Sequence, residues 1–143
     1  MKFWDSSAIV PLLVEQQHSA GLVQLLGEDP DVVVWWSTPT ECASAIARLE
    51  RDRGLDNLEV EAAFLKLDQL SEVWTEVLPT NGVRNTARRL LRTHPLRASD
   101  ALQLAAALIL TAPHAAKPPF VCLDDRLVSA ARKEGFQVVL PGS

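Results

Sequence analysis

Short, continuously apolar stretches alternate along the chain with longer segments in which apolar residues recur every three or four positions. The first kind, rich in β-branched and aromatic residues, is typical of buried parallel strands, and the second of helices with one buried face. We expect strands at Lys2–Trp4, Val32–Trp36, Val73–Leu78, Phe120–Leu123 and Gln137–Leu140. We expect helices at Ser6–Val14, Ser19–Leu26, Thr38–Arg53, Asn57–Glu72, Thr80–Thr93, Arg97–Leu110 and Asp124–Glu134.

Local signals mark several of these boundaries. In Thr38-Pro39-Thr40-Glu41, a Thr stands at the expected cap, a Pro in the first turn and a Glu three residues after the Thr, which together indicate a capping box. Gly54 ends that helix and His94-Pro95 interrupts a later one. The segment Thr111–Pro119 holds three prolines and is expected to be a loop.

Strands that alternate with helices predict an α/β fold, a three-layer αβα sandwich with a central, mostly parallel sheet. A chain of 143 residues fits one domain, so we expect residues 1–143 to form a single unit. Ligands of such open sheets bind beyond the carboxyl ends of the strands. We therefore expect the functional residues at that edge of the sheet.

Composition narrows the choice of partners. The net charge is -4 and the pI is near 5.3, which argues against capture of nucleic acid by overall charge. Any attraction to RNA must therefore come from local arginines and a bound metal. The ten arginines outnumber the four lysines, which favours planar, bidentate contacts to phosphate or carboxylate.

The two cysteines, Cys42 and Cys122, are too few and too far apart for a disulfide framework or a zinc site. Their number is typical of a reducing cytoplasm. An acid at position 5 interrupts the first apolar stretch, so we expect no signal peptide, and no apolar run is long enough to span a membrane.

Four acids fall near the expected carboxyl edge of the sheet. Asp5, Glu41 and Asp124 follow predicted strands, and Asp100 lies in the first turn of its own helix. Each one taken singly is explained as a helix cap, because helix N-termini favour acids. The run Asp5-Ser6-Ser7 also offers a carboxylate and two hydroxyls on one turn, and Asp100 has mostly apolar neighbours.

Four ionised carboxylates around one site would repel one another. A pair about 6 Å apart costs roughly 2.8 kcal/mol at an effective dielectric constant of 20. Such a site must either bind protons or bind a cation, and hard divalent ions prefer carboxylate and water oxygens. The sequence therefore favours a divalent metal at these acids.

The segments around the four acids resemble the PIN domain family and, within it, the VapC-type toxins. Asp100 lies in the strongest match, and Asp124 is preferred to Asp125 because three residues separate it from Leu127. Cys122 stands where the family usually has Thr or Ser. The matching segments, in order along the chain, are Trp4–Leu12, Thr40–Ala45, Leu96–Ala107 and Phe120–Gly135.

This resemblance implies a Mg²⁺- or Mn²⁺-dependent endoribonuclease that leaves 5′-phosphate and 3′-hydroxyl ends. It implies that one or two metal ions are held by Asp5, Asp100 and either or both of Glu41 and Asp124, all four being catalytic. Ser7, and also Ser6, would orient water or a carboxylate. The resemblance further implies the toxin of a type II toxin–antitoxin pair, with a cognate antitoxin protein and a homodimeric state.

Other features leave alternatives open. Arg84, Arg88 and Arg92 share one helical face, which is either a contact surface for RNA or a partner protein, or simply a solvated face. Trp35 and Trp36 are expected in the core. The competing functions are a catalytically weak PIN domain that binds RNA or assembles complexes, and a receiver-type phosphoacceptor domain, which would need a second acid beside Asp5.

Overall fold

The computed structural model describes residues 1–111 and 116–141. Its sheet has five strands, and every strand pairing is parallel, in the order β3-β2-β1-β4-β5. This arrangement confirms the predicted α/β fold with a parallel central sheet. The strands are β1 (Lys2–Trp4), β2 (Val32–Trp35), β3 (Thr75–Val77), β4 (Phe120–Val121) and β5 (Val138–Val139).

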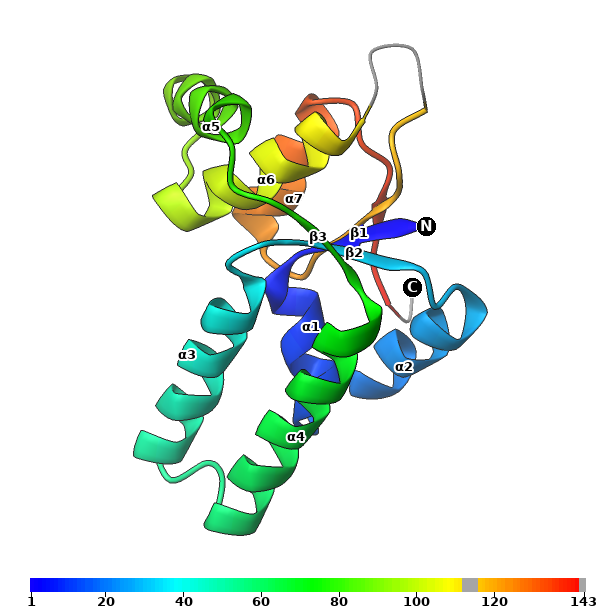
Figure 1. The fold of residues 1–143 in the computed structure, drawn as a ribbon, viewed down its shortest axis with the longest axis vertical. Coiled ribbons are helices and arrows are strands. Elements are labelled where there is room, and N and C mark those ends of the chain that lie inside the picture. Colours follow the sequence, from blue (N-terminus) through cyan, green and yellow to red (C-terminus); the bar gives the residue numbers. More distant parts are fainter. Residues whose placement is uncertain (112–115, 142–143) are drawn as a thin grey trace.

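Helices cover both faces of the sheet and produce three layers (Figure 1). One layer contains α1 (Ser6–Leu13), α2 (Ser19–Glu28), α3 (Thr38–Arg51) and α4 (Asn57–Val73). The other contains α5 (Asn81–Thr93), α6 (Ala98–Leu110) and α7 (Asp125–Lys133). Each predicted helix is present with small shifts at its ends. Within residues 1–111 and 116–141, no helix is long and apolar enough to cross a membrane.

The predicted loop from Thr111 to Pro119 falls partly outside the described residues, which omit 112–115. Its remaining part, residues 116–119, forms neither helix nor strand and leads directly into β4.

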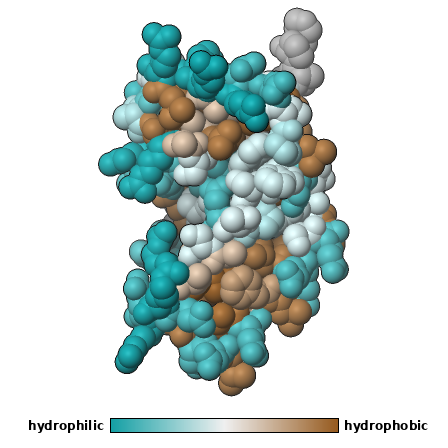
Figure 2. All heavy atoms as spheres, turned by 60° about the vertical axis from the view of Figure 1, so that its left-hand side comes forward, coloured by the Kyte–Doolittle hydropathy of each residue, from teal (hydrophilic) through white to brown (hydrophobic). Residues whose placement is uncertain are grey.

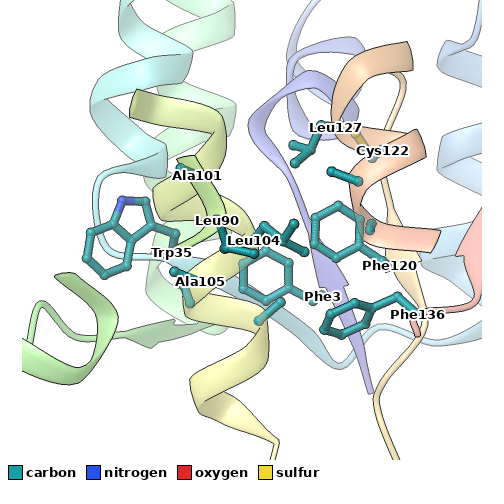
Figure 3. Packing of buried hydrophobic residues seen from close by; sticks show 14 of the residues in the cluster. Phe3, Trp35, Leu90, Ala101, Leu104, Ala105, Phe120, Cys122, Leu127 and Phe136 are labelled. Atoms are coloured by element: carbon teal, nitrogen blue, oxygen red, sulfur yellow. The ribbon is translucent and has the colours of Figure 1, made fainter. Parts of the chain in front are cut away.

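Alternate residues of β1 enter separate hydrophobic cores. Phe3 packs with the layer of α5, α6 and α7, where its ring stacks on that of Phe120 with centroids 5.4 Å apart (Figure 3). Trp4 packs on the opposite face with Ile9 and Ile46. Burying one such side chain stabilises the fold by roughly 1.5–3 kcal/mol. One short strand therefore fixes the position of both helical layers.

The two tryptophans at the end of β2 differ in burial. Trp35 is in the core and 5% exposed, whereas Trp36 is 52% exposed, so the prediction that both lie in the core is wrong for Trp36. β2 ends at Trp35, and the backbone N–H of Trp36 donates to the Val77 carbonyl at 3.0 Å, at the margin of the sheet.

The strand order reverses direction at β1. From the central strand, β2 and β3 extend to one side and β4 and β5 to the other. Reversal of this kind leaves a crevice at the carboxyl ends of the two strands that flank it. Here those strands are β1 and β4, and the N–H of Asp5 donates to the Val121 carbonyl at 3.0 Å.

Candidate active site

Asp5 lies at the floor of this crevice, where β1 ends and α1 begins. Its carboxylate caps α1 by accepting from the Ser7 N–H at 3.1 Å, and it also accepts from the Ser7 hydroxyl at 2.5 Å. The Cys122 thiol donates to the same oxygen at 3.5 Å. Burial nevertheless raises the pKa of Asp5, and the charge of Asp100 adds to the rise. Asp5 is thus a cap that also carries a costly buried charge.

Glu41, in the first turn of α3, is held by donors from three segments. Its carboxylate accepts from the Ser37 hydroxyl at 2.9 Å, the Gln103 amide at 3.0 Å and the Ser6 hydroxyl at 3.2 Å. Burial raises the pKa of Glu41, and the charge of Asp5 raises it further. The three donors oppose this rise and fix the direction of the side chain.

The predicted capping box at the start of α3 is wrong. Ser37, not Thr38, occupies the N-cap position, and its hydroxyl bonds to the Glu41 side chain rather than to a backbone N–H. Thr38 is the first helical residue and is buried, and its hydroxyl accepts from Gln103 at 3.1 Å. Tertiary contacts therefore take up the side chains that local capping would have used.

Asp100 and Asp124 begin two helices on the other side of the crevice. Asp124 caps α7 by accepting from the Leu127 N–H at 3.1 Å. Asp100, in the first turn of α6, accepts from the Arg97 N–H at 3.4 Å. Asp100 and Asp124 line the same hollows, and burial, followed by the charge of Asp124, raises the pKa of Asp100.

All four acids border one pocket of about 400 Å³. The four acids lie far apart in the sequence, because they come from the starts of α1, α3, α6 and α7. In Figure 2 the surface is indented between the two helical layers, which agrees with a cleft at the sheet edge. Ser6 and Ser7 also line the pocket, together with Val10, Ser44, Ala45, Arg48 and Ser99.

The arginines singled out on α5 lie outside this pocket. Arg88 and Arg92 border a separate shallow hollow on α5, and Arg84 borders another hollow with Trp35. Their neighbour Arg89 forms an ion pair with Glu134 at 2.9 Å. The structure therefore groups the predicted carboxylates and serines but separates the α5 arginines from them.

Gln103 contributes to this site although the sequence did not single it out. Its side chain is fully buried and donates to both Thr38 and Glu41, so it joins α6 to α3. The available signal was a polar residue in a helix of alanines and leucines, one turn after Asp100 and on the same side. Its partners are 65 and 62 residues away, so spacing did not reveal them.

The donor set suits a hard divalent cation. Carboxylate and hydroxyl oxygens surround the pocket, and burial, with a smaller contribution from neighbouring carboxylates, raises the pKa of Asp5, Glu41 and Asp100. Within residues 1–111 and 116–141, however, no three His, Cys, Asp or Glu side chains stand close enough together to hold a metal ion as they are placed. The residue chemistry fits a divalent metal, and the side chains would have to move closer together to bind one.

Comparison with known proteins places this arrangement in a family. The family model described as PIN domain matches residues 2–133, which include all four acids. The chain belongs to the PIN domain family. Members of this family are generally nucleases. Among curated proteins, no match was found.

The fold of this PIN domain is also similar to a solved structure, FitAcB from Neisseria gonorrhoeae. The two chains superpose with a TM-score of 0.67 at 18% sequence identity. The match covers 99% of this chain and 98% of the other. At this identity the similarity confirms the fold over the whole length of the PIN domain, including its last strand.

Proposed function

We propose that this PIN domain is a Mg²⁺- or Mn²⁺-dependent endoribonuclease. The observation that carries the proposal is the convergence of Asp5, Glu41, Asp100 and Asp124 on one pocket in a chain of a nuclease family. Carboxylates from four helix starts serve no common structural purpose, because each cap needs only its own helix. A shared cation explains why they face one cavity.

In this proposal Asp5, Asp100 and Asp124 hold the metal, with Glu41 at the opposite wall of the pocket as a further ligand. A bound Mg²⁺ or Mn²⁺ would supply activation of water for attack on phosphorus and stabilisation of the leaving oxygen. Hydrogen bonds from neighbouring serine and glutamine side chains hold two of these acids in place. Ser7 fixes Asp5, and Ser6, Ser37 and Gln103 fix Glu41.

Among residues 1–111 and 116–141, no thiol or imidazole supplies a nucleophile at this pocket. Burial raises the pKa of Cys42 to about 12 and raises that of Cys122 as well, so both remain thiols at neutral pH. Of the histidines that the structure describes, none lines the pocket, and His94 is bound to Glu134 at 2.7 Å. Oxygen ligands are what the site offers.

We further propose that the protein is a VapC-type toxin of a type II toxin–antitoxin pair, acting as one domain in the cytoplasm. The motif resemblance supports this assignment, with the cognate antitoxin and the homodimer as its implied partners. Cys42 and Cys122 are both free, as a reducing compartment would leave them. A short open reading frame directly upstream of the gene would support the assignment, and its absence would favour a stand-alone nuclease.

The first test is metal-dependent cleavage of labelled RNA by wild type, Asp5→Asn and Asp100→Asn. Both variants should lose at least about 100-fold in kcat, because each removes a charge that the metal requires. Asp68→Asn, on the exposed outer face of α4, removes the same charge elsewhere and should keep full activity. Retained cleavage in either site variant contradicts the assignment of the acids.

Metal binding is tested separately by thermal unfolding. Mn²⁺ at 100 times its Kd should raise Tm of the wild type by roughly 5–10 °C, and Asp5→Asn should lose most of this gain. A wild type that binds Mn²⁺ and RNA without turnover would instead identify the catalytically weak, RNA-binding PIN domain.

A further inference from the structure

A ribonuclease with an acidic pocket and a net charge of -4 needs a positive surface to receive RNA. The α5 arginines do not border the carboxylates, so they do not meet this need at the reacting phosphate. Three other arginines do lie at the rim of the acidic pocket.

Two of them lie beside Asp100. A second pocket, of about 310 Å³, is lined by Arg97, Arg126 and Asp125 together with Ser99, Asp100 and Asp124. The last three residues also line the carboxylate pocket. The two hollows therefore adjoin along this shared wall, and in the groove that they make Arg97 and Arg126 lie beside Asp100 and Asp124.

Arg97 and Arg126 are held at this rim by the backbone. Arg97 is the N-cap of α6, and Arg126 is the second residue of α7, so both arginines lie at helix starts that border the groove. Both side chains are exposed, and among the ion pairs of the described residues neither appears.

Arg48 lies at the other end of the groove. It is an exposed residue of α3, about two turns after Glu41, and it lines the carboxylate pocket itself. The order along the groove is thus Arg48, the four carboxylates, then Arg97 and Arg126. Positive charge on both sides of an acidic centre matches a chain of phosphates in which only the central one reacts.

We propose that Arg97 and Arg126 bind the backbone phosphates of RNA on one side of the cleaved bond, and that Arg48 binds a phosphate on the other side. This inference rests on the proposed ribonuclease function and adds the residues that receive its substrate. Guanidinium groups suit the task because they bind phosphate oxygens in a bidentate manner. Single-stranded RNA is the ligand tested, since its backbone offers consecutive phosphates to arginines on either side of the carboxylates.

The test compares Arg97→Ala/Arg126→Ala with the control Lys66→Ala/Arg132→Ala, which removes two exposed charges far from the groove. Binding of a labelled single-stranded RNA is followed by fluorescence anisotropy between 50 and 200 mM salt, with Asp5→Asn added to each variant to prevent cleavage. Two lost phosphate contacts should make the slope of log Kd against log salt shallower by about 1.4. The control should keep the wild-type slope.

Cleavage by the same variants without Asp5→Asn gives an independent readout. KM should rise by about tenfold while kcat stays within about twofold, because the arginines bind phosphates that do not react. Arg48→Ala should act in the same direction with a slope change of about 0.7. If the double variant does not fold, the single variants Arg97→Ala and Arg126→Ala carry the same test.

The outcomes separate this inference from the function on which it rests. An unchanged slope and KM in a wild-type background that cleaves RNA overturns the arginine assignment and leaves the ribonuclease in place. A wild type that neither binds nor cleaves RNA overturns both. Loss of binding to poly-glutamate with an unchanged RNA slope would instead assign the arginines to an acidic protein and overturn the proposal.

Discussion

At the scale of single residues, Gln103 shows how a buried polar group serves the site. Its amide N–H groups bind Thr38 and Glu41, while its Oε1 is buried with no hydrogen-bond partner among the described residues. A buried unsatisfied carbonyl costs about 1–3 kcal/mol. A leucine would avoid this cost, so the glutamine is explained by what it does for Glu41.

Gln103→Leu should therefore affect activity more than stability. The Gln103 bond lowers the pKa of Glu41, and its loss raises that pKa. The acid limb of the pH–rate profile should move to higher pH, and kcat at neutral pH should fall by about tenfold. The measurement is RNA cleavage from pH 5 to pH 9 in saturating Mn²⁺.

Gln69→Leu is the matched control, because Gln69 is an exposed glutamine on α4. It should leave the profile unchanged. If Gln103→Leu lowered Tm but left the acid limb of the pH–rate profile in place, Gln103 would have only a structural role.

At the scale of elements, the helix starts are both caps and walls of the pocket. Asp124 illustrates this, since it caps α7 and also borders both hollows of the groove. Asn is as good a cap as Asp, whereas Ala is a poor one. The two substitutions therefore separate the structural contribution from the chemical one.

Asp124→Ala should lower stability by about 1 kcal/mol and Asp124→Asn by much less, while both reduce cleavage to a similar extent. Urea denaturation in EDTA measures the first quantity, and cleavage in Mn²⁺ the second. Full activity in Asp124→Asn would show that capping is the only role of this acid.

The helices and strands were predictable because hydrophobic periodicity, capping residues and helix-breaking residues are local features of the sequence. Thr80 caps α5 as expected, and the limits of β1 are those predicted. The cap at the start of α3 was predicted wrongly. The Ser37 hydroxyl bonds to Glu41 and the Thr38 hydroxyl to Gln103, so neither forms a local cap. The exposure of Trp36 was missed because the apolar run in the sequence continues one residue past the end of β2.

At the scale of the whole molecule, the acidic pocket opposes folding when no metal is bound. Asp5, Glu41 and Asp100 have raised pKa values, so the folded chain binds protons more tightly than the unfolded chain. Its free energy of unfolding must then fall as pH rises above the ordinary carboxyl range. Asp29 and Glu134 have lowered pKa values, but their stabilisation is already complete above that range.

In EDTA, Tm should therefore be lower at pH 7 than at pH 5, and Mn²⁺ should reverse the difference. Asp5→Asn should decline less with pH and should exceed wild type at pH 7 by a few degrees in EDTA. Differential scanning calorimetry measures both trends. A Tm in EDTA that rises from pH 5 to pH 7 would contradict the burial of uncompensated charge.

The site as a whole was only partly predictable. The acids could be grouped because the carboxyl ends of parallel strands share an edge, and the pocket does bring them together. The arginines of the groove were missed because charge alone does not distinguish Arg48, Arg97 and Arg126 from the other arginines. Their relevance comes from the packing of α3, α6 and α7 around one crevice.

The position of β1 at the centre of the sheet has a consequence for protein synthesis. Phe3 of β1 pairs with Phe120 of β4. One edge of β1 therefore stays unpaired until the last quarter of the chain has been synthesised. Asp124 reaches Asp5 only after that pairing forms. A nascent chain on the ribosome, extended at about 5–20 residues per second, has an incomplete pocket until its synthesis is nearly finished.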